Sequence, residues 1–127
     1  MARHKTAQNC AVLPWMSRRQ NNSEGRFLQV GNSLLLSSTN EAGEEQNPFV
    51  RLSAGAKYLY ICMAMEAGGK RKFEFTRTAA KKYGICSSTL RRNIDELIDA
   101  GFIIRDSGWT VREPNRYSFS YQWKGQQ

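Results

Sequence analysis

Residues 76–105 read TRTAAKKYGICSSTLRRNIDELIDAGFIIR and give the strongest indication of the fold. Thr76 is a suitable N-cap for a short helix over 77–83, and Gly84 supplies the left-handed residue that ends such a helix. A longer helix of about 87–100 follows. Two helices joined by a turn of about four residues that contains glycine are typical of a helix-turn-helix.

The longer helix has two chemically different ends. Either Cys86 or Ser87 caps its start, where Arg91 and Arg92 also lie. Its core stripe consists of Leu90, Ile94, Leu97 and Ile98, and its carboxylates all lie in the second half, at Asp95, Glu96 and Asp99. A duplex laid across the start of this helix therefore meets cations and avoids most carboxylates.

The flanking sequence completes a winged form of this motif. A strand is expected at 72–75 because polar and apolar residues alternate there, and two more are expected at 102–105 and 116–124. The stretch 106–115 between them predicts an exposed, basic hairpin loop, or wing. The sequence thus predicts an α+β winged helix-turn-helix: a three-helix core, a small antiparallel sheet and a wing, plus an N-terminal extension.

The first core helix, from the Ser53 N-cap to Ala67, is apolar on two faces. One face packs against the rest of the domain, and the other also needs a cover. Two covers stay open at this point: the segment 27–36 of the same chain, or a second subunit, which would make a homodimer.

Residues 1–50 differ from the rest in charge. Residues 1–26 carry five basic residues against Glu24, a net charge of +4, and their polar, aperiodic sequence predicts a disordered basic arm. This arm either touches phosphate or is an ordinary tail. Residues 27–50 carry three glutamates and no Lys or Arg, a net charge of −3, and form the N-terminal extension.

Within this extension the sequence predicts a short strand at 27–30 and a helical turn at 34–36 that Ser33 caps. An acidic surface loop is expected from 37 to 48. Residues 51–127, with fourteen basic and seven acidic residues and a net charge of +7, form the winged helix-turn-helix domain.

Composition excludes several classes of protein. The 127 residues carry a formal charge of +8, which favours an anionic partner, and no apolar run approaches the roughly 20 residues of a membrane span. Three scattered cysteines favour a reducing cytoplasm. With one histidine, in the polar tail, and no phosphate loop, the sequence predicts no enzyme, no metal site, no cofactor and no small-molecule ligand.

Residues 76–105 resemble the helix-turn-helix of bacterial winged-helix regulators and plasmid replication initiators. The longer stretch 49–123 is similar to small winged-helix proteins of bacterial plasmids, phages and conjugative elements. The residues that carry the resemblance are Ala79-Ala80, Gly84-Ile85, Thr89-Leu90-Arg91, Leu97 and Gly101-Phe102-Ile103. Many relatives have Ser or Thr at the helix cap, where this chain has Cys86.

The resemblance implies that the third helix enters the major groove of double-stranded DNA. The residues at its base-contacting end are Ser87, Ser88, Thr89 and Arg91. Phosphate or wing contacts are expected from Arg77, Lys81, Lys82, Arg92, Trp109, Arg112, Asn115 and Arg116. The implied function is that of a small transcriptional regulator or accessory factor of a bacterial mobile element.

Each of these residues also has an ordinary structural role open to it. The basic pairs at 81–82 and 91–92 are also compatible with solvated faces, Trp109 with the core of the hairpin, and Thr89 with a bond to its own backbone. The alternative function is a winged-helix interaction module that scaffolds a replication or transfer complex. A positive surface at the third helix and the wing favours DNA over that alternative.

Overall fold

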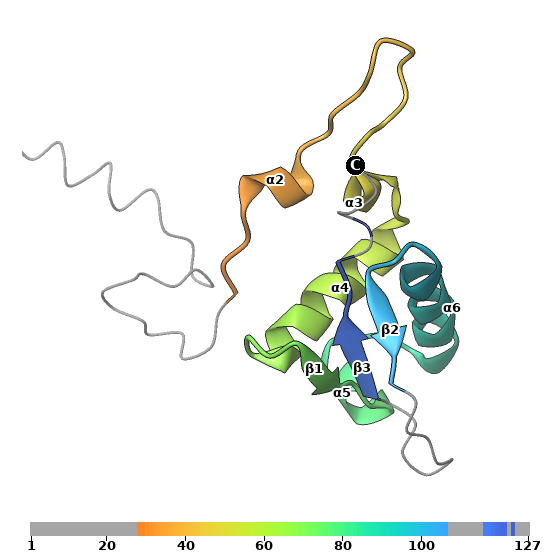
Figure 1. Cartoon of the computed structure of the whole chain (residues 1–127). Helices are drawn as coiled ribbons and strands as arrows, with labels where there is room; N and C mark the ends of the chain where they lie inside the picture. Colours follow the sequence, from red (N-terminus) through yellow and green to blue (C-terminus); the bar gives the residue numbers. More distant parts are fainter. Residues whose placement is uncertain (1–27, 107–115, 122, 124–127) are drawn as a thin grey trace, which may run out of the picture.

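The computed structural model of the chain describes residues 28–106, 116–121 and 123. These residues form an α+β structure with five helices and a three-stranded antiparallel sheet of order β1-β3-β2 (Figure 1). The predicted α+β class is therefore confirmed. The helices are α2 (Asn32–Leu35), α3 (Pro48–Arg51), α4 (Ala54–Ala67), α5 (Arg77–Lys82) and α6 (Ser87–Asp99), and the strands are β1 (Lys72–Glu74), β2 (Ile103–Arg105) and β3 (Arg116–Phe119).

The ends of α5 and α6 are built in the same way. After α5, the Ile85 N–H donates to Ala80 O at 2.9 Å and the Gly84 N–H to Lys81 O at 3.0 Å. After α6, the corresponding bonds run from Phe102 and Gly101 to Leu97 and Ile98, at 2.9 and 3.1 Å. Both glycines have positive φ, of 77° and 85°. This is the Schellman motif, and it turns the buried side chains of Ile85 and Phe102 back into the core.

The start of α4 and the start of α5 are capped as the sequence predicts. The Ser53 hydroxyl accepts from the Ala56 N–H, and the Thr76 hydroxyl accepts from the Ala79 N–H. Gly68, with φ 60°, ends α4. The glycine and hydroxyl signals therefore placed these boundaries correctly.

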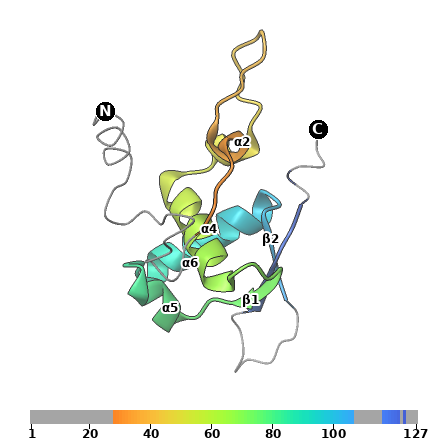
Figure 2. The same cartoon turned by 90° about the vertical axis from the view of Figure 1, so that its left-hand side faces the viewer.

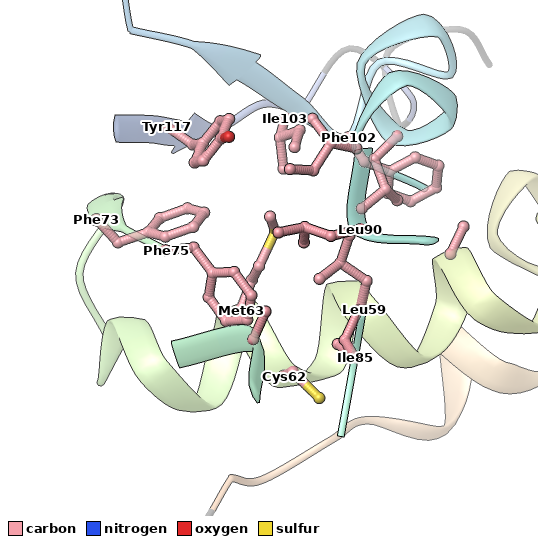
Figure 3. Close-up of a cluster of buried hydrophobic side chains, with 14 of the residues drawn as sticks. Leu59, Cys62, Met63, Phe73, Phe75, Ile85, Leu90, Phe102, Ile103 and Tyr117 are labelled. Carbon is pink, nitrogen blue, oxygen red and sulfur yellow. The ribbon is translucent and has the colours of Figure 1, made fainter. Parts of the chain in front are cut away.

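One continuous core joins α4, α5, α6 and the sheet. Figure 3 shows Leu59 and Met63 of α4 in the same cluster as side chains from the sheet and from α6, and both are fully buried. The labelled neighbours include Phe73, Phe75, Ile85, Leu90, Phe102, Ile103 and Tyr117. Because α4, α5, α6 and the sheet all contribute side chains to this cluster, α6 is held in a fixed orientation to the sheet.

Tyr60, on the same apolar face of α4 as Leu59 and Met63, is covered by aromatic rings of the same chain. The Tyr60 ring lies 5.9 Å from that of Phe49, 5.2 Å from that of Phe102 and 5.7 Å from that of Phe119, between ring centroids. Tyr58, two residues earlier, is 52% exposed. The first face is therefore covered by α3 and by residues in and next to the sheet. The second face is only partly covered, because Cys62 is buried there while Tyr58 stays exposed.

Three predictions for the extension and the last strand are wrong in detail. Residues 28–30 form no strand, and the helical turn is α2, whose N-cap is Gly31 and not Ser33. Leu34 packs against the core from within this helix. β3 ends at Phe119, earlier than expected, although the Ser120 N–H still donates to Phe102 O at 2.9 Å in register with the β2–β3 pairing.

Helix α3 lies where an acidic loop and its end were expected, and it was not predicted from the sequence. Pro48 occupies its first turn, and the Asn47 side chain caps it by accepting from the Phe49 N–H at 3.0 Å. No helix in the described residues is long and apolar enough to cross a membrane.

Candidate nucleic-acid interface

The start of α6 presents hydroxyl groups at the protein surface. Ser87 and Ser88 are exposed and Thr89 is half-buried, while Leu90 next to them is buried and anchors the first turn. Because the orientation of α6 is fixed by the core, these three hydroxyl-bearing positions have a fixed placement. All four candidate base-contacting residues, Arg91 included, are thus among the first five residues of one helix.

Cys86, and not Ser87, is the N-cap of α6, and its side chain makes no cap bond to the backbone. Its exposed thiol instead bonds the Thr89 hydroxyl at 3.2 Å and lies 3.7 Å from the Ser88 hydroxyl. Thr89 first, and then Ser88, stabilise the thiolate and lower the pKa of Cys86 to about 7. Because Ser87 does not act as the cap, it keeps its place among the candidate contact residues.

Four cations surround this end of the helix. Arg91 and Arg92 on α6, and Arg77 and Lys81 on α5, are all exposed. Within residues 28–106, 116–121 and 123, the ion pairs are Lys82–Glu66 and Arg116–Glu74, so none of the four is paired there. Unpaired, exposed cations are the groups that can exchange counterions for phosphates.

A groove of about 400 Å³ lies between α5 and α6. Its walls carry the two α5 cations together with Cys86 and Ser87, over a floor that includes Ile85 and Leu90. Thr78 also lines the groove, and this residue was not among those predicted from the sequence. The helical spacing could have indicated Thr78, since positions 77, 78 and 81 fall on one face of a helix.

Two of the predicted phosphate-contacting residues have partners inside the protein. Lys82 Nζ lies 3.0 Å from Glu66 Oε2 on α4, and it also lies 5.5 Å from the centroid of the Tyr83 ring. Arg116 Nε lies 3.4 Å from Glu74 Oε2 on the neighbouring strand. Their charges are partly compensated, so these two side chains contribute less positive potential than the four unpaired cations.

The carboxylates of α6 lie away from its start. Asp95 and Asp99 are exposed, while Glu96 is half-buried. Glu96 accepts from the Ser53 backbone N–H at 2.8 Å and from the Ser53 hydroxyl at 2.7 Å. The helix thus carries cations at its start, where the free N–H groups also favour anions, and carboxylates in its second half.

The wing predicted at 106–115 lies largely outside the described residues. This applies to Trp109, Arg112 and Asn115, whose predicted contacts remain predictions. Arg116 begins β3 and thus marks where the chain enters the sheet again.

No protein-family model matches this chain, and comparison with curated proteins and with solved structures gives no match either. The resemblance to winged-helix proteins therefore rests on the sequence of residues 49–123 and stays a prediction. No group of three or more His, Cys, Asp or Glu side chains in the described part of the chain is arranged to hold a metal ion.

Proposed function

We propose that the protein is a winged helix-turn-helix DNA-binding protein that binds double-stranded DNA sequence-specifically through the start of α6. The observation that carries the proposal is a set of four exposed cations, none of them ion-paired within the described residues, that surround the exposed serines at this helix end. These cations are Arg77, Lys81, Arg91 and Arg92.

The arrangement suits a duplex in two ways. Arg77 and Lys81 on α5 flank the groove beside α6, where they can neutralise backbone phosphates while α6 occupies the major groove. Arg91 lies one turn into α6, where a guanidinium can donate two hydrogen bonds to a guanine edge. The serine hydroxyls beside it supply short donors and acceptors for neighbouring bases or phosphates.

In the cell, we propose a role as a small transcriptional regulator or accessory factor of a bacterial mobile element. Its effect follows from occupation of a site, since α6 supplies binding groups and the function needs no chemical step. Residues 106–115 act as the wing in this proposal and steady the register on the duplex.

The experiment is selection of bound sequences from a random duplex pool at physiological salt, followed by affinity measurements on the selected duplex. Arg91→Ala is expected to lose about 1–3 kcal/mol of discrimination between the selected duplex and a scrambled one. Arg51→Ala is the matched control, because Arg51 is also exposed but precedes Ser53, which contacts the second half of α6. A pool that shows no enrichment, or equal losses in the two variants, would contradict the proposal.

A further inference from the structure

Residues 28–47 form an acidic arm that stands outside the core. Its helix α2 has no buried residue, and Val30, Leu35 and Leu36 are 40%, 55% and 60% exposed. The neighbouring Leu34, in contrast to Leu35 and Leu36, packs against the core. An exposed cluster of large aliphatic side chains on a protruding element is typical of an interaction surface.

Hydrogen bonds nonetheless hold the arm in one conformation. The buried Asn47 amide donates to the carbonyl oxygens of Ser33, Leu34 and Leu36, at 3.3, 3.0 and 2.8 Å. The Glu45 carboxylate accepts from the Ser38 N–H at 2.7 Å and from the Asn47 N–H at 3.1 Å. A surface that is already ordered loses little conformational entropy when a partner binds.

The charge of the arm indicates the charge of its partner. Glu41, Glu44 and Glu45 give it a net charge of −3, whereas residues 51–127 carry +7. In both views the hairpin of the arm points away from α5 (Figures 1 and 2). A negative element at the far end from α5 does not suit DNA and suits a positive protein surface, which a second copy of this chain supplies.

A matching surface is present on α4. Tyr58 is 52% exposed, and its hydroxyl donates to Tyr83 O at 3.0 Å, so the ring is held in place. Lys57 adjoins it, and the exposed Ala54 lies one turn before both. An aromatic ring, a small residue and a cation together complement the leucines and carboxylates of the arm.

We propose that the protein forms a symmetric homodimer in which the acidic arm of each chain packs against Ala54, Lys57 and Tyr58 on α4 of the other. The contact is made twice about a two-fold axis, which is the commonest way for identical chains to associate. The contact does not depend on DNA, so it is tested without it.

Sedimentation velocity of the full chain is the first test. The wild type is expected to be a dimer, and Leu35→Asp is expected to raise the dimer dissociation constant at least about tenfold, because a charge enters the apolar contact. Ile104→Asp is the control, since Ile104 is 46% exposed on β2 and lies outside the contact. A wild type that is monomeric up to about 100 μM, where even weak specific dimers associate, would overturn the proposal.

A charge-swap experiment identifies the receiving face. One variant carries E41K and E44K in the arm, and the other carries K57E on α4; each alone is expected to dimerise at least several-fold more weakly than the wild type. Mixing them is expected to restore a heterodimer, because the lysines of one arm then face Glu at position 57 while the second contact stays wild type. Two variants that stay monomeric when mixed, or that dimerise separately as well as the wild type, would overturn the assignment of α4.

Discussion

The carboxylate of Glu96 on α6 accepts two hydrogen bonds from Ser53 at the start of α4. One comes from the Ser53 backbone N–H at 2.8 Å and the other from its hydroxyl at 2.7 Å. The two residues are 43 positions apart in the sequence. The same Ser53 hydroxyl accepts from the Ala56 N–H at 3.2 Å. One carboxylate thus fixes the N-cap of α4 and sets the position of α6 against it, in the half of α6 away from the proposed DNA contact.

This contact predicts the effect of removing the carboxylate. Glu96→Ala is expected to lower the free energy of unfolding by about 1–2 kcal/mol, because Ser53 loses a charged acceptor and its cap is no longer held. Urea denaturation measures the change. Asp99→Ala, at an exposed site on the same helix, is expected to stay within about 0.5 kcal/mol of the wild type. Equal effects of the two substitutions would contradict the role given to Glu96.

Gly55 of α4 lies directly against the side chain of Asn93 on α6. A Cβ at this position would come within 2.7 Å of Asn93 Nδ2 and 3.2 Å of Asn93 Oδ1. Gly55→Ala is therefore expected to destabilise the protein by about 1–3 kcal/mol, although alanine favours helix by about 1 kcal/mol.

The Asn93→Ala background tests that explanation for Gly55. With the amide gone, Gly55→Ala is expected to be neutral or stabilising, which a double-mutant cycle in urea shows as a coupling energy. An equal cost of Gly55→Ala in both backgrounds would mean that the crowding is not with Asn93.

Cys86 is predicted to react with iodoacetamide in a pH-dependent way. Because only the thiolate reacts, a pKa of about 7 gives half of the maximal rate near pH 7 and about a tenth of it near pH 6, with a plateau above about pH 8. Peptide mass mapping follows this site separately from Cys62, which is 4% exposed and whose pKa burial raises. Thr89→Val is expected to move the Cys86 midpoint upward, and a wild-type midpoint near 9 would contradict the hydrogen-bonded geometry.

Because Glu66 pairs with Lys82, neutralising Glu66 is expected to raise the affinity for DNA. Glu66→Gln keeps the size of the side chain but releases the charge of Lys82, so affinity for any duplex is expected to rise about two- to fivefold. Lys82→Ala is then expected to cost more affinity in the Glu66→Gln background than in the wild type. Fluorescence anisotropy with an unselected duplex measures both. Equal losses in the two backgrounds would show that Glu66 does not restrain Lys82.

The parts of the fold that follow from local chemistry were predictable from the sequence. Ser53 and Thr76 cap the helices expected to follow them, and Gly84 and Gly101 adopt the positive φ that ends α5 and α6. These signals depend on bonds between residues only a few positions apart. For the same reason the boundaries of α4 and α5 were predicted to within one residue or so.

Features that depend on distant residues were not predictable. The strand expected at 27–30 is absent from 28–30, because this part of the arm has no neighbouring strand to pair with in the described residues. The partner of Lys82 lies 16 positions away, and that of Glu96 lies 43 positions away. Charge along the chain placed the cations at the start of α6 correctly, but it could not tell which of them remain unpaired.

Salt dependence of duplex binding tests the central claim most directly. For the wild type, the logarithm of the association constant is expected to fall linearly with the logarithm of salt concentration, by about 0.9 for each phosphate neutralised. The variant R91A/R92A is expected to lose the phosphate contact of Arg92, so its slope is shallower by about 0.9. Wild-type affinity that does not change between low and physiological salt, or an unchanged slope in R91A/R92A, would contradict DNA binding at the start of α6.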